Sequence, residues 1–144
     1  MKGFLEVALL SAAKAMWDQD LTLSEYSDQT SEHELNLAFH YGCELRRWFP
    51  WFDCDFDVTK KHFSSKRPDL VLHKRNASHA NFLVVEIKRA RRRSEVPDDI
   101  TKIRNNWFDP LLAYRFGAAL VLDEDGRSAE VTILERENAV ERMS

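Results

Sequence analysis

The sequence predicts an α/β fold, in which a central mixed β-sheet is flanked by helices. Three observations predict it: helical periodicity within the first fifty residues, two nearly continuous apolar segments at 69–73 and 82–88, and two further apolar segments at 118–122 and 130–134. Short apolar runs bounded by polar loops are typical of strands covered on both faces. The expected order of elements is α-α-β-β-β-α-β-β, which favours helices on both sides of one sheet.

Length and composition fit a single globular domain. The chain has 144 residues, of which 44% are hydrophobic, enough apolar material for one core. We expect one domain over residues 1–144, in which a helix and loop at 1–30 precede a core at 31–135. Cys43 and Cys54 lack the spacing of a metal site or of a disulfide framework, so a reducing, cytoplasmic location is expected.

The N-terminal segment predicts an amphipathic helix. Its apolar residues include the i, i+3, i+4 spacing of a helix with one buried face: Leu5, Val7, Ala8, Leu9, Ala12 and Met16. Glu6 and Lys14 interrupt what would be the apolar region of a signal peptide. No run approaches the roughly 18 apolar residues of a membrane span, so no membrane partner is expected.

A second helix is expected after a polar, aperiodic loop at 18–30. Ser31 and Glu34 have the spacing of a capping box, and Pro50 ends the helix. One face is expected to carry Leu35, Ala38, Phe39, Gly42, Leu45 and Phe49. Glu32 falls on the same face, because positions 32, 35 and 39 are separated by three and four residues.

Three strands are expected in the middle of the chain. Residues 52–59 alternate apolar and acidic side chains, which predicts a half-buried strand. Residues 69–73 and 82–88 are nearly continuous in apolar character, which indicates two central strands. The polar stretch 74–81 between them predicts a hairpin loop.

The last part of the chain predicts helices followed by two strands. A helix is expected to open at Pro97, and Asp109-Pro110 has the pattern of an N-cap followed by proline at the first helical position. Strands are expected at 118–122 and 130–134, joined by a turn at 124–127.

Basic residues are concentrated in one part of the chain. The net charge is −3, yet residues 60–93 hold eleven of the 21 lysines and arginines and only two acids, a charge of +9 against −12 for the remainder. The eleven are Lys60, Lys61, Lys66, Arg67, Lys74, Arg75, Lys88, Arg89, Arg91, Arg92 and Arg93. This asymmetry favours a basic face that binds a polyanion. An ordinary solvated surface is the alternative.

Two charges interrupt the strand expected at 82–88. Glu86 and Lys88 are two residues apart, so they project from one face while Ile87 packs on the other. Asp69 begins the neighbouring strand and lies beside them if the two strands pair as a hairpin. Two convergent carboxylates suit Mg²⁺, and an adjacent lysine can offset the charge that develops during phosphodiester hydrolysis. A structural Glu86–Lys88 ion pair is the alternative.

These residues resemble the signature of a known nuclease superfamily. The segment RPDLVLH at 67–73, followed by LVVEIK at 83–88, resembles the PD-(D/E)xK motif of the restriction-endonuclease-like nucleases. The resemblance runs from about Ser31 to Asp123. It implies a restriction-endonuclease-like core, a Mg²⁺ cofactor for which Mn²⁺ can substitute, and a nucleic-acid substrate, with DNA as the first choice.

The resemblance extends to small stand-alone members of that superfamily. Their first helix opens with a glutamate and a leucine three residues later, here Glu32 and Leu35, and a later helix carries an Asp-x-x-Lys element, here Asp99 and Lys102. The resemblance implies that the Glu32 carboxylate also holds the metal, directly or through a water. The alternatives are that Glu32 is an exposed acid at a helix N-terminus, or that Glu34 takes its place.

Further residues are expected to bind phosphates around this centre: Lys60, Lys61, Arg89, Arg91, Arg92, Arg93 and Lys102. Asp55, in an acidic strand that the same relatives share, is a weaker candidate for the site, and so is Lys102. Trp48, Trp51 and Trp107 carry rings that can stack on bases, but core packing explains them better. The five histidines lack the spacing of a zinc site.

Two functions from different classes are consistent with these patterns. The first is a Mg²⁺-dependent DNA endonuclease or related phosphodiesterase with Asp69, Glu86 and Lys88 at its centre, assisted by Glu32. The second is a catalytically silent module that keeps the nuclease fold and binds nucleic acid or a protein partner. A double-strand cut by a chain of this size would require two active sites, so a homodimer is one form that the first function predicts.

Overall fold

The computed structural model describes residues 1–29, 34–56 and 67–137. Its main elements are α1 (Lys2–Gln19), α2 (Leu23–Gln29), α3 (Glu34–Leu45), β1 (Asp53–Phe56), β2 (Leu70–His73), β3 (Leu83–Arg89), α4 (Val96–Lys102), β4 (Phe116–Asp123) and β5 (Ser128–Glu135). Short 3₁₀ segments lie at Arg46–Trp48, Ser78–Ala80 and Ala90–Glu95, and a π-helical turn, η5 (Ile103–Trp107), continues α4. Within the described ranges, none of the helices has the length and apolar character needed to cross a membrane.

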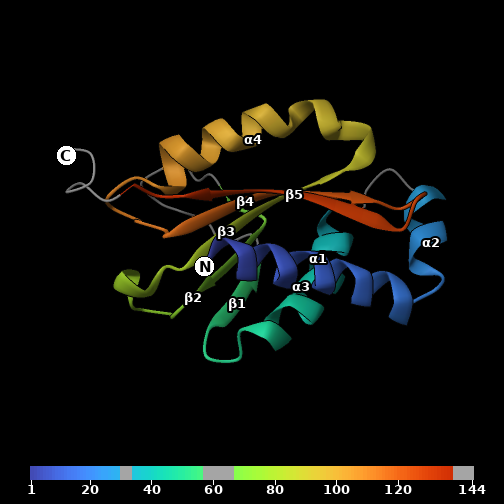
Figure 1. Cartoon of the computed structure of the whole chain (residues 1–144), viewed down its shortest axis with the longest axis horizontal. Coiled ribbons are helices and arrows are strands. Elements are labelled where there is room, and N and C mark those ends of the chain that lie inside the picture. The colour runs from blue at the N-terminus through green and yellow to red at the C-terminus, as the bar shows by residue number, and fades with distance from the viewer. Residues whose placement is uncertain (30–33, 57–66, 138–144) are drawn as a thin grey trace.

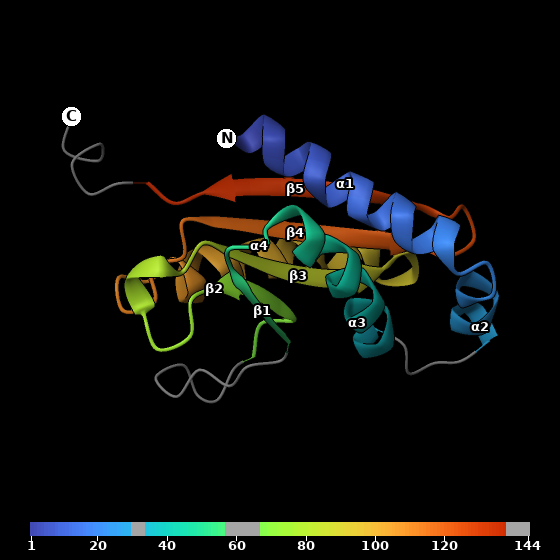
Figure 2. The ribbon, with the colours of Figure 1, turned by 90° about the horizontal axis from the view of Figure 1, so that it is seen from below.

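The five strands form one mixed sheet in the order β1-β2-β3-β4-β5. All neighbouring pairs are antiparallel except β3 and β4, which are parallel because the chain crosses over through α4 between them. Figure 1 shows α4 on one side of the sheet, and Figure 2 shows α1 and α3 on the other. The expected α/β class is therefore confirmed, with helices covering both faces of a mixed sheet.

Strand alternation divides the core into two layers. Leu83, Val85 and Ile87 of β3 belong to the larger cluster, which lies between the sheet and the helices α1 and α3. Val84 of β3 belongs to a smaller cluster beneath α4, together with Val71, Ile103, Trp107 and Tyr114. Side chains at even-numbered positions of β3 therefore face α4. This face carries the candidate site.

Helix α1 is part of the larger core layer. Its buried residues are Leu5, Ala8, Leu9, Ala12, Ala13, Met16 and Trp17. The Tyr41 hydroxyl of α3 donates to the Leu9 carbonyl at 2.8 Å, and the Trp17 indole donates to the Ser128 carbonyl at 3.2 Å. These bonds join the helix to α3 and to β5. Val7, expected on the buried face, is exposed.

The expected loop at 18–30 contains a helix. Asp20 ends the first helix, and its Oδ1 accepts hydrogen bonds from both the backbone N–H and the hydroxyl of Thr22. Leu23 then begins α2 and is only 4% exposed. The prediction failed because a single anchoring apolar residue gives no periodic pattern in the sequence.

The buried face of helix α3 is confirmed in part. Ala38, Gly42 and Leu45 are buried as expected, and so is Phe49 after the helix. Leu35 and Phe39, expected on the same face, are 62% and 52% exposed, whereas Leu37 and Tyr41 are fully buried in their place. Apolar residues lie on more than one side of this helix, so spacing alone did not locate the edges of the buried face. Ser31 lies outside the described residues, so the capping box stays a prediction.

No helix begins at Asp109-Pro110. The segment is a turn in which Asp109 Oδ1 accepts a hydrogen bond from the backbone N–H of Leu111 at 2.9 Å. Ala113 follows with a φ of 51°, in the left-handed region, which a helix cannot contain. The same local side-chain bond that caps a helix also stabilises an isolated turn, and here the turn prevails.

The orientation of α3 predicts unequal effects of two matched substitutions. Leu37→Ala should lower the free energy of unfolding by about 2–5 kcal/mol, because it removes a fully buried side chain and leaves a cavity. Leu35→Ala should change it by no more than about 0.5 kcal/mol, because that side chain is largely exposed. Urea unfolding of both variants measures the difference. Equal losses would contradict the orientation of the helix.

Candidate functional site

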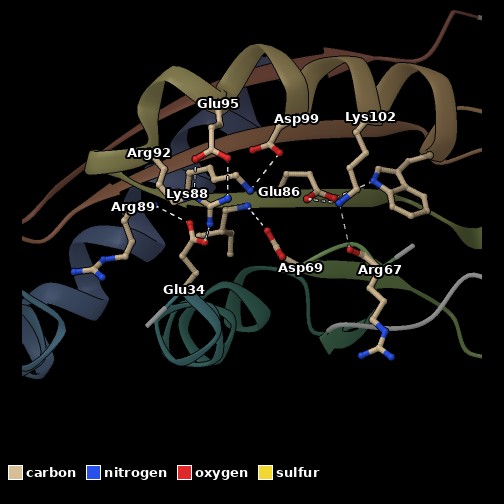
Figure 3. Close-up of polar contacts among 12 residues, drawn as sticks. Glu34, Arg67, Asp69, Glu86, Lys88, Arg89, Arg92, Glu95, Asp99 and Lys102 are labelled. Atoms are coloured by element: carbon tan, nitrogen blue, oxygen red, sulfur yellow. Dashed lines mark hydrogen bonds and ion pairs between the residues drawn. The ribbon is translucent and has the colours of Figure 1, made fainter. Parts of the chain in front are cut away.

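Glu86 and Lys88 project from the same face of β3, toward α4 (Figure 3). Ile87 between them packs in the larger core layer on the opposite face. This is the arrangement expected from strand alternation. Both charges therefore lie between a central strand and its crossover helix, where each requires a partner.

Asp69 lies beside Glu86. Strands β2 and β3 pair antiparallel with Leu70 opposite Val85, so one further step along this register places Asp69 opposite Glu86. The backbone N–H of Ile87 donates to Asp69 Oδ2 at 2.6 Å, which holds the carboxylate next to β3. The hairpin expected from the sequence thus brings the two acids together.

Glu86 is a buried carboxylate with two donors. It is 1% exposed, its Oε1 accepts from the Trp107 indole N–H at 2.9 Å, and its Oε2 accepts from Lys102 Nζ at 3.3 Å. Burial and, next, the charge of Asp69 raise the pKa of Glu86 to about 8. Burial likewise raises the pKa of Asp69. Burial therefore disfavours the ionised form of both carboxyl groups, and further positive charge nearby would favour it.

Lys88 pairs with a second acid of α4. Its Nζ lies 3.3 Å from Asp99 Oδ1, and Asp99 Oδ2 is buried with no hydrogen-bond partner. Burial opposes the charge on Lys88, but Asp99 and Asp69 outweigh it and raise the pKa of this lysine. Burial raises the pKa of Asp99, against the charge of Lys88. Lys88 therefore stays an ammonium group at neutral pH.

Two crossed ion pairs connect β3 with α4. Glu86 binds Lys102 and Lys88 binds Asp99, so the strand and the helix each contribute one acid and one base. The order of the charges is reversed between the two elements: Glu86 precedes Lys88 on the strand and binds Lys102, whereas Asp99 precedes Lys102 on the helix and binds Lys88. Lys102 was expected to bind nucleic acid; it instead binds Glu86 and the Arg67 carbonyl.

Helix α3 contributes Glu34 to this region. Glu34 Oε1 pairs with Arg92, its Oε2 accepts from the backbone N–H of Arg89 at 3.3 Å, and its charge helps to raise the pKa of Lys88. Glu32 lies outside the described residues. The face argument that directed Glu32 inward is wrong, because the residues on which it rested, at 35 and 39, are exposed. Glu34 is the α3 acid that the structure places near the site.

Arg89, expected to bind phosphates, is buried and paired with an acid. It is 2% exposed and its Nε donates to Glu124 Oε1 at 2.8 Å. As an odd-numbered residue of β3, it projects away from Glu86 and Lys88. The prediction assumed that the strand had ended before this arginine. The strand in fact includes Arg89. Its side chain is therefore buried, where it forms an ion pair with Glu124.

The other arginines of the run also have acidic partners. Arg92 binds both carboxylate oxygens of Glu95, and Arg93 binds Glu130 at 3.0 Å. Arg91 lies 3.9 Å from the carboxylate that Arg89 also contacts. The side chains of Arg91 and Arg93 are about half exposed and that of Arg92 is 42% exposed, so all three keep some surface for a ligand. Lys60 and Lys61 lie outside the described residues.

Asp55 belongs to a separate polar cluster on β1 and β2. Its Oδ2 lies 2.7 Å from His73 Nε2, and its Oδ1 accepts from Arg75 at 2.6 Å. The hydrogen bond from Arg75 lowers the pKa of Asp55 to about 2. Asp55 therefore binds His73 and Arg75 rather than the residues around Glu86, which agrees with its being the weaker candidate.

Sequence reasoning underrated three residues of the site. Trp107 was assigned to core packing, Lys102 to the surface, and Asp99 only to a family pattern, yet all three contact Glu86 or Lys88. The i, i+3 spacing of Asp99 and Lys102 was the available signal. This spacing places Asp99 and Lys102 on one side of the helix. It does not show that this side faces β3, because the position of α4 on the sheet cannot be predicted from local periodicity.

Comparisons of the chain with family models, with curated proteins and with solved structures found no match. The described residues contain no group of three or more His, Cys, Asp or Glu arranged to hold a metal ion. The chemistry therefore has to be argued from Asp69 and Glu86, the two carboxylates that the sheet brings together, and from the lysines beside them.

The raised pKa of Glu86 predicts how stability changes with pH. Between its ordinary value of 4.5 and about 8, the folded protein binds more protons than the unfolded chain, so the free energy of unfolding should fall as pH rises. Glu86→Gln should flatten this fall between pH 6 and pH 9, as measured by urea unfolding. Lys102→Met should move it to higher pH, because Lys102 lowers the Glu86 pKa. An unchanged slope in Glu86→Gln would refute the assignment.

Proposed function

We propose that the chain is a Mg²⁺-dependent nuclease that hydrolyses phosphodiester bonds. The observation that carries the proposal is the juxtaposition of Asp69 and Glu86, two largely buried carboxylates from adjacent strands, with Lys88 on the same face. The sequence resemblance to the PD-(D/E)xK nucleases supports the same residues and points to DNA as the substrate class. A cut through both strands would require two copies of the chain.

The chemistry of the two carboxylates fits a divalent cation. Asp69, Glu86 and Asp99 with Lys88 and Lys102 carry a formal charge of −1 when all five are ionised, and burial raises the pKa of every acid among them. Mg²⁺ prefers carboxylate oxygens, and Mn²⁺ takes similar ligands. Asp69 and Glu86 would hold the ion. When bound, it would polarise the phosphoryl group and activate a water.

Lys88 supplies a fixed positive charge beside the two carboxylates. Its pKa lies above the ordinary value, so it remains protonated throughout the neutral range. Asp99 positions the ammonium group through a contact of 3.3 Å. A charge held in place before the reaction stabilises the negative charge that develops on phosphate, and it does so better than a mobile one. Asp99 is thus a positioning residue.

Trp107 and Lys102 hold the Glu86 carboxylate in orientation. The indole N–H bonds one oxygen and the Lys102 ammonium bonds the other, so both oxygens are directed before any ligand arrives. Lys102 also acts as a counter-ion for Glu86. In the absence of a metal ion, its ammonium group balances the negative charge of this carboxylate. The 3.3 Å contact with a side chain that is 30% exposed leaves Lys102 able to move aside.

One observation favours the second function, a silent module that binds nucleic acid or a protein. Within the described ranges, ion pairs already engage Glu86, Lys88 and most of the arginine run. Internal pairing can stabilise a fold without any catalysis. The two functions differ in one respect: the nuclease cleaves only with a metal, whereas the module binds equally well in EDTA.

Cleavage assays separate the two functions. Purified protein is incubated with plasmid, linear duplex, single-stranded DNA and RNA, in Mg²⁺, Mn²⁺ or EDTA. Asp69→Asn and Glu86→Gln should abolish cleavage, because each removes a carboxylate that would hold the ion. Lys88→Ala should reduce the rate about 10²- to 10³-fold, as for other single electrostatic donors. Binding without cleavage in either metal would replace the nuclease with the silent module.

Matched variants control this experiment. Glu6→Gln makes the same chemical change as Glu86→Gln on the exposed side of α1 and should leave the rate unchanged. Asp99→Asn should slow cleavage less than Lys88→Ala, and the double variant should be no slower than Lys88→Ala alone, because Asp99 acts through Lys88. Equal cleavage by wild type and Glu86→Gln would assign the activity to a contaminant or to another site.

A further inference from the structure

A hollow lies at the opposite end of β3 from Lys88. It has a volume of about 300 Å³ and is lined among others by Phe52, His79, Asn81, Phe82, Arg115 and Arg136. These residues adjoin the start of β3, the start of β4 and the end of β5. Phe82 precedes Glu86 by four strand positions, about 13 Å of extended chain, so the hollow is separate from the candidate nuclease centre. Its size is at the lower limit of ligand pockets.

Two arginines that line this hollow lie opposite each other on neighbouring strands. Arg115 precedes β4 and Arg136 follows β5, one step beyond the pair Phe116 and Glu135. The Arg136 backbone N–H donates to the Arg115 carbonyl at 2.9 Å, which continues the ladder and keeps the two residues opposite each other. Like charges directly opposite on neighbouring strands repel each other. An arrangement of this kind is stabilised by an anion between them.

Neither arginine has an acidic partner among the residues that the structure describes. The Nε of Arg136 is buried and has no hydrogen-bond acceptor within residues 1–29, 34–56 and 67–137. This contrasts with Arg89, Arg92 and Arg93, each of which binds a carboxylate. A buried guanidinium donor without an acceptor is unfavourable, so it indicates a place for a ligand that accepts hydrogen bonds.

Two aromatic rings form part of the apolar lining of the hollow. The rings of Phe52 and Phe82 stack with centroids 4.8 Å apart and planes 5° apart. The Asn81 side-chain amide donates to the Leu112 carbonyl at 2.7 Å, which fixes the wall behind them. An exposed histidine, His79, lies on the rim. An apolar base with a few convergent polar groups is the usual composition of a small-ligand site.

We propose that this hollow binds a phosphate group, held between Arg115 and Arg136. Two guanidinium groups carry a charge of +2, which a phosphate monoester with a charge of about −1.5 to −2 at pH 7 nearly neutralises, whereas one carboxylate neutralises only half of it. The planar fork of arginine donors matches phosphate oxygens in pairs. The phosphate monoester belongs to a free nucleotide or to the phosphorylated end of a nucleic-acid chain. The site does not depend on the proposed nuclease activity.

The test measures binding of inorganic phosphate, AMP and a single-stranded oligothymidylate that carries a 5′-phosphate by calorimetry, in EDTA and at low salt. At least one probe should bind with a stoichiometry of one per chain. Arg115→Gln and Arg136→Gln should each weaken that binding about tenfold or more, because each removes charge-assisted hydrogen bonds. Arg104→Gln, which removes the same charge from an exposed arginine outside this hollow, should leave it unchanged.

The pattern of affinities identifies the source of the phosphate. Tighter binding of AMP than of phosphate assigns the site to a nucleotide, and tighter binding of the oligonucleotide assigns it to a nucleic-acid chain. Phosphate should also raise the melting temperature of wild type and of Glu86→Gln, but not of Arg115→Gln. Failure of all three probes to bind, or equal weakening by Arg104→Gln and Arg115→Gln, overturns the proposal whatever the result of the cleavage assays.

Discussion

The crossed ion pairs between β3 and α4 constrain both the fold and the chemistry of this protein. Glu86 and Asp99 are almost fully buried, and each is acceptable there only because a lysine of the facing element binds it. Buried ion pairs add little net stability, since desolvation offsets their attraction, but removing one partner leaves an unpaired buried charge. The pairs therefore fix the position of α4 on the sheet rather than strengthen the core. Trp107 adds a third restraint on Glu86.

Charge in this chain is asymmetric in sequence but largely balanced in space. The basic middle segment folds against acids from α3, α4, η4 (Ala90–Glu95) and the last two strands, so most of its described arginines are neutralised within the molecule. The positive charge left for a polyanion is smaller than the +9 of the segment. It lies on side chains that keep exposed surface: Arg67, Lys74, Arg75, Arg91, Arg92 and Arg93 in the segment, and Arg115 and Arg136 at the other end of the sheet.

Local patterns predicted the parts of the fold that depend on alternation along a strand. The positions of Glu86 and Lys88 on one face, and of Asp69 on the neighbouring strand, required only a period of two and a hairpin. The exposure of Leu35 and the burial of Leu37 were not predictable in this way, because both residues are equally apolar and only the packing of the folded chain distinguishes them. The partners of Lys88 and Glu86 depend on where the crossover helix lies, and that is a property of the whole fold.

Metal binding tests the central claim most directly, namely that Asp69 and Glu86 together hold one divalent cation. Calorimetric titration of Mn²⁺ into the wild-type protein should show one ion per chain. The same titration should show no binding by Glu86→Gln or Asp69→Asn, and unchanged binding by Glu6→Gln. Absence of binding by the wild type, or equal binding by the wild type and Glu86→Gln, would contradict the account.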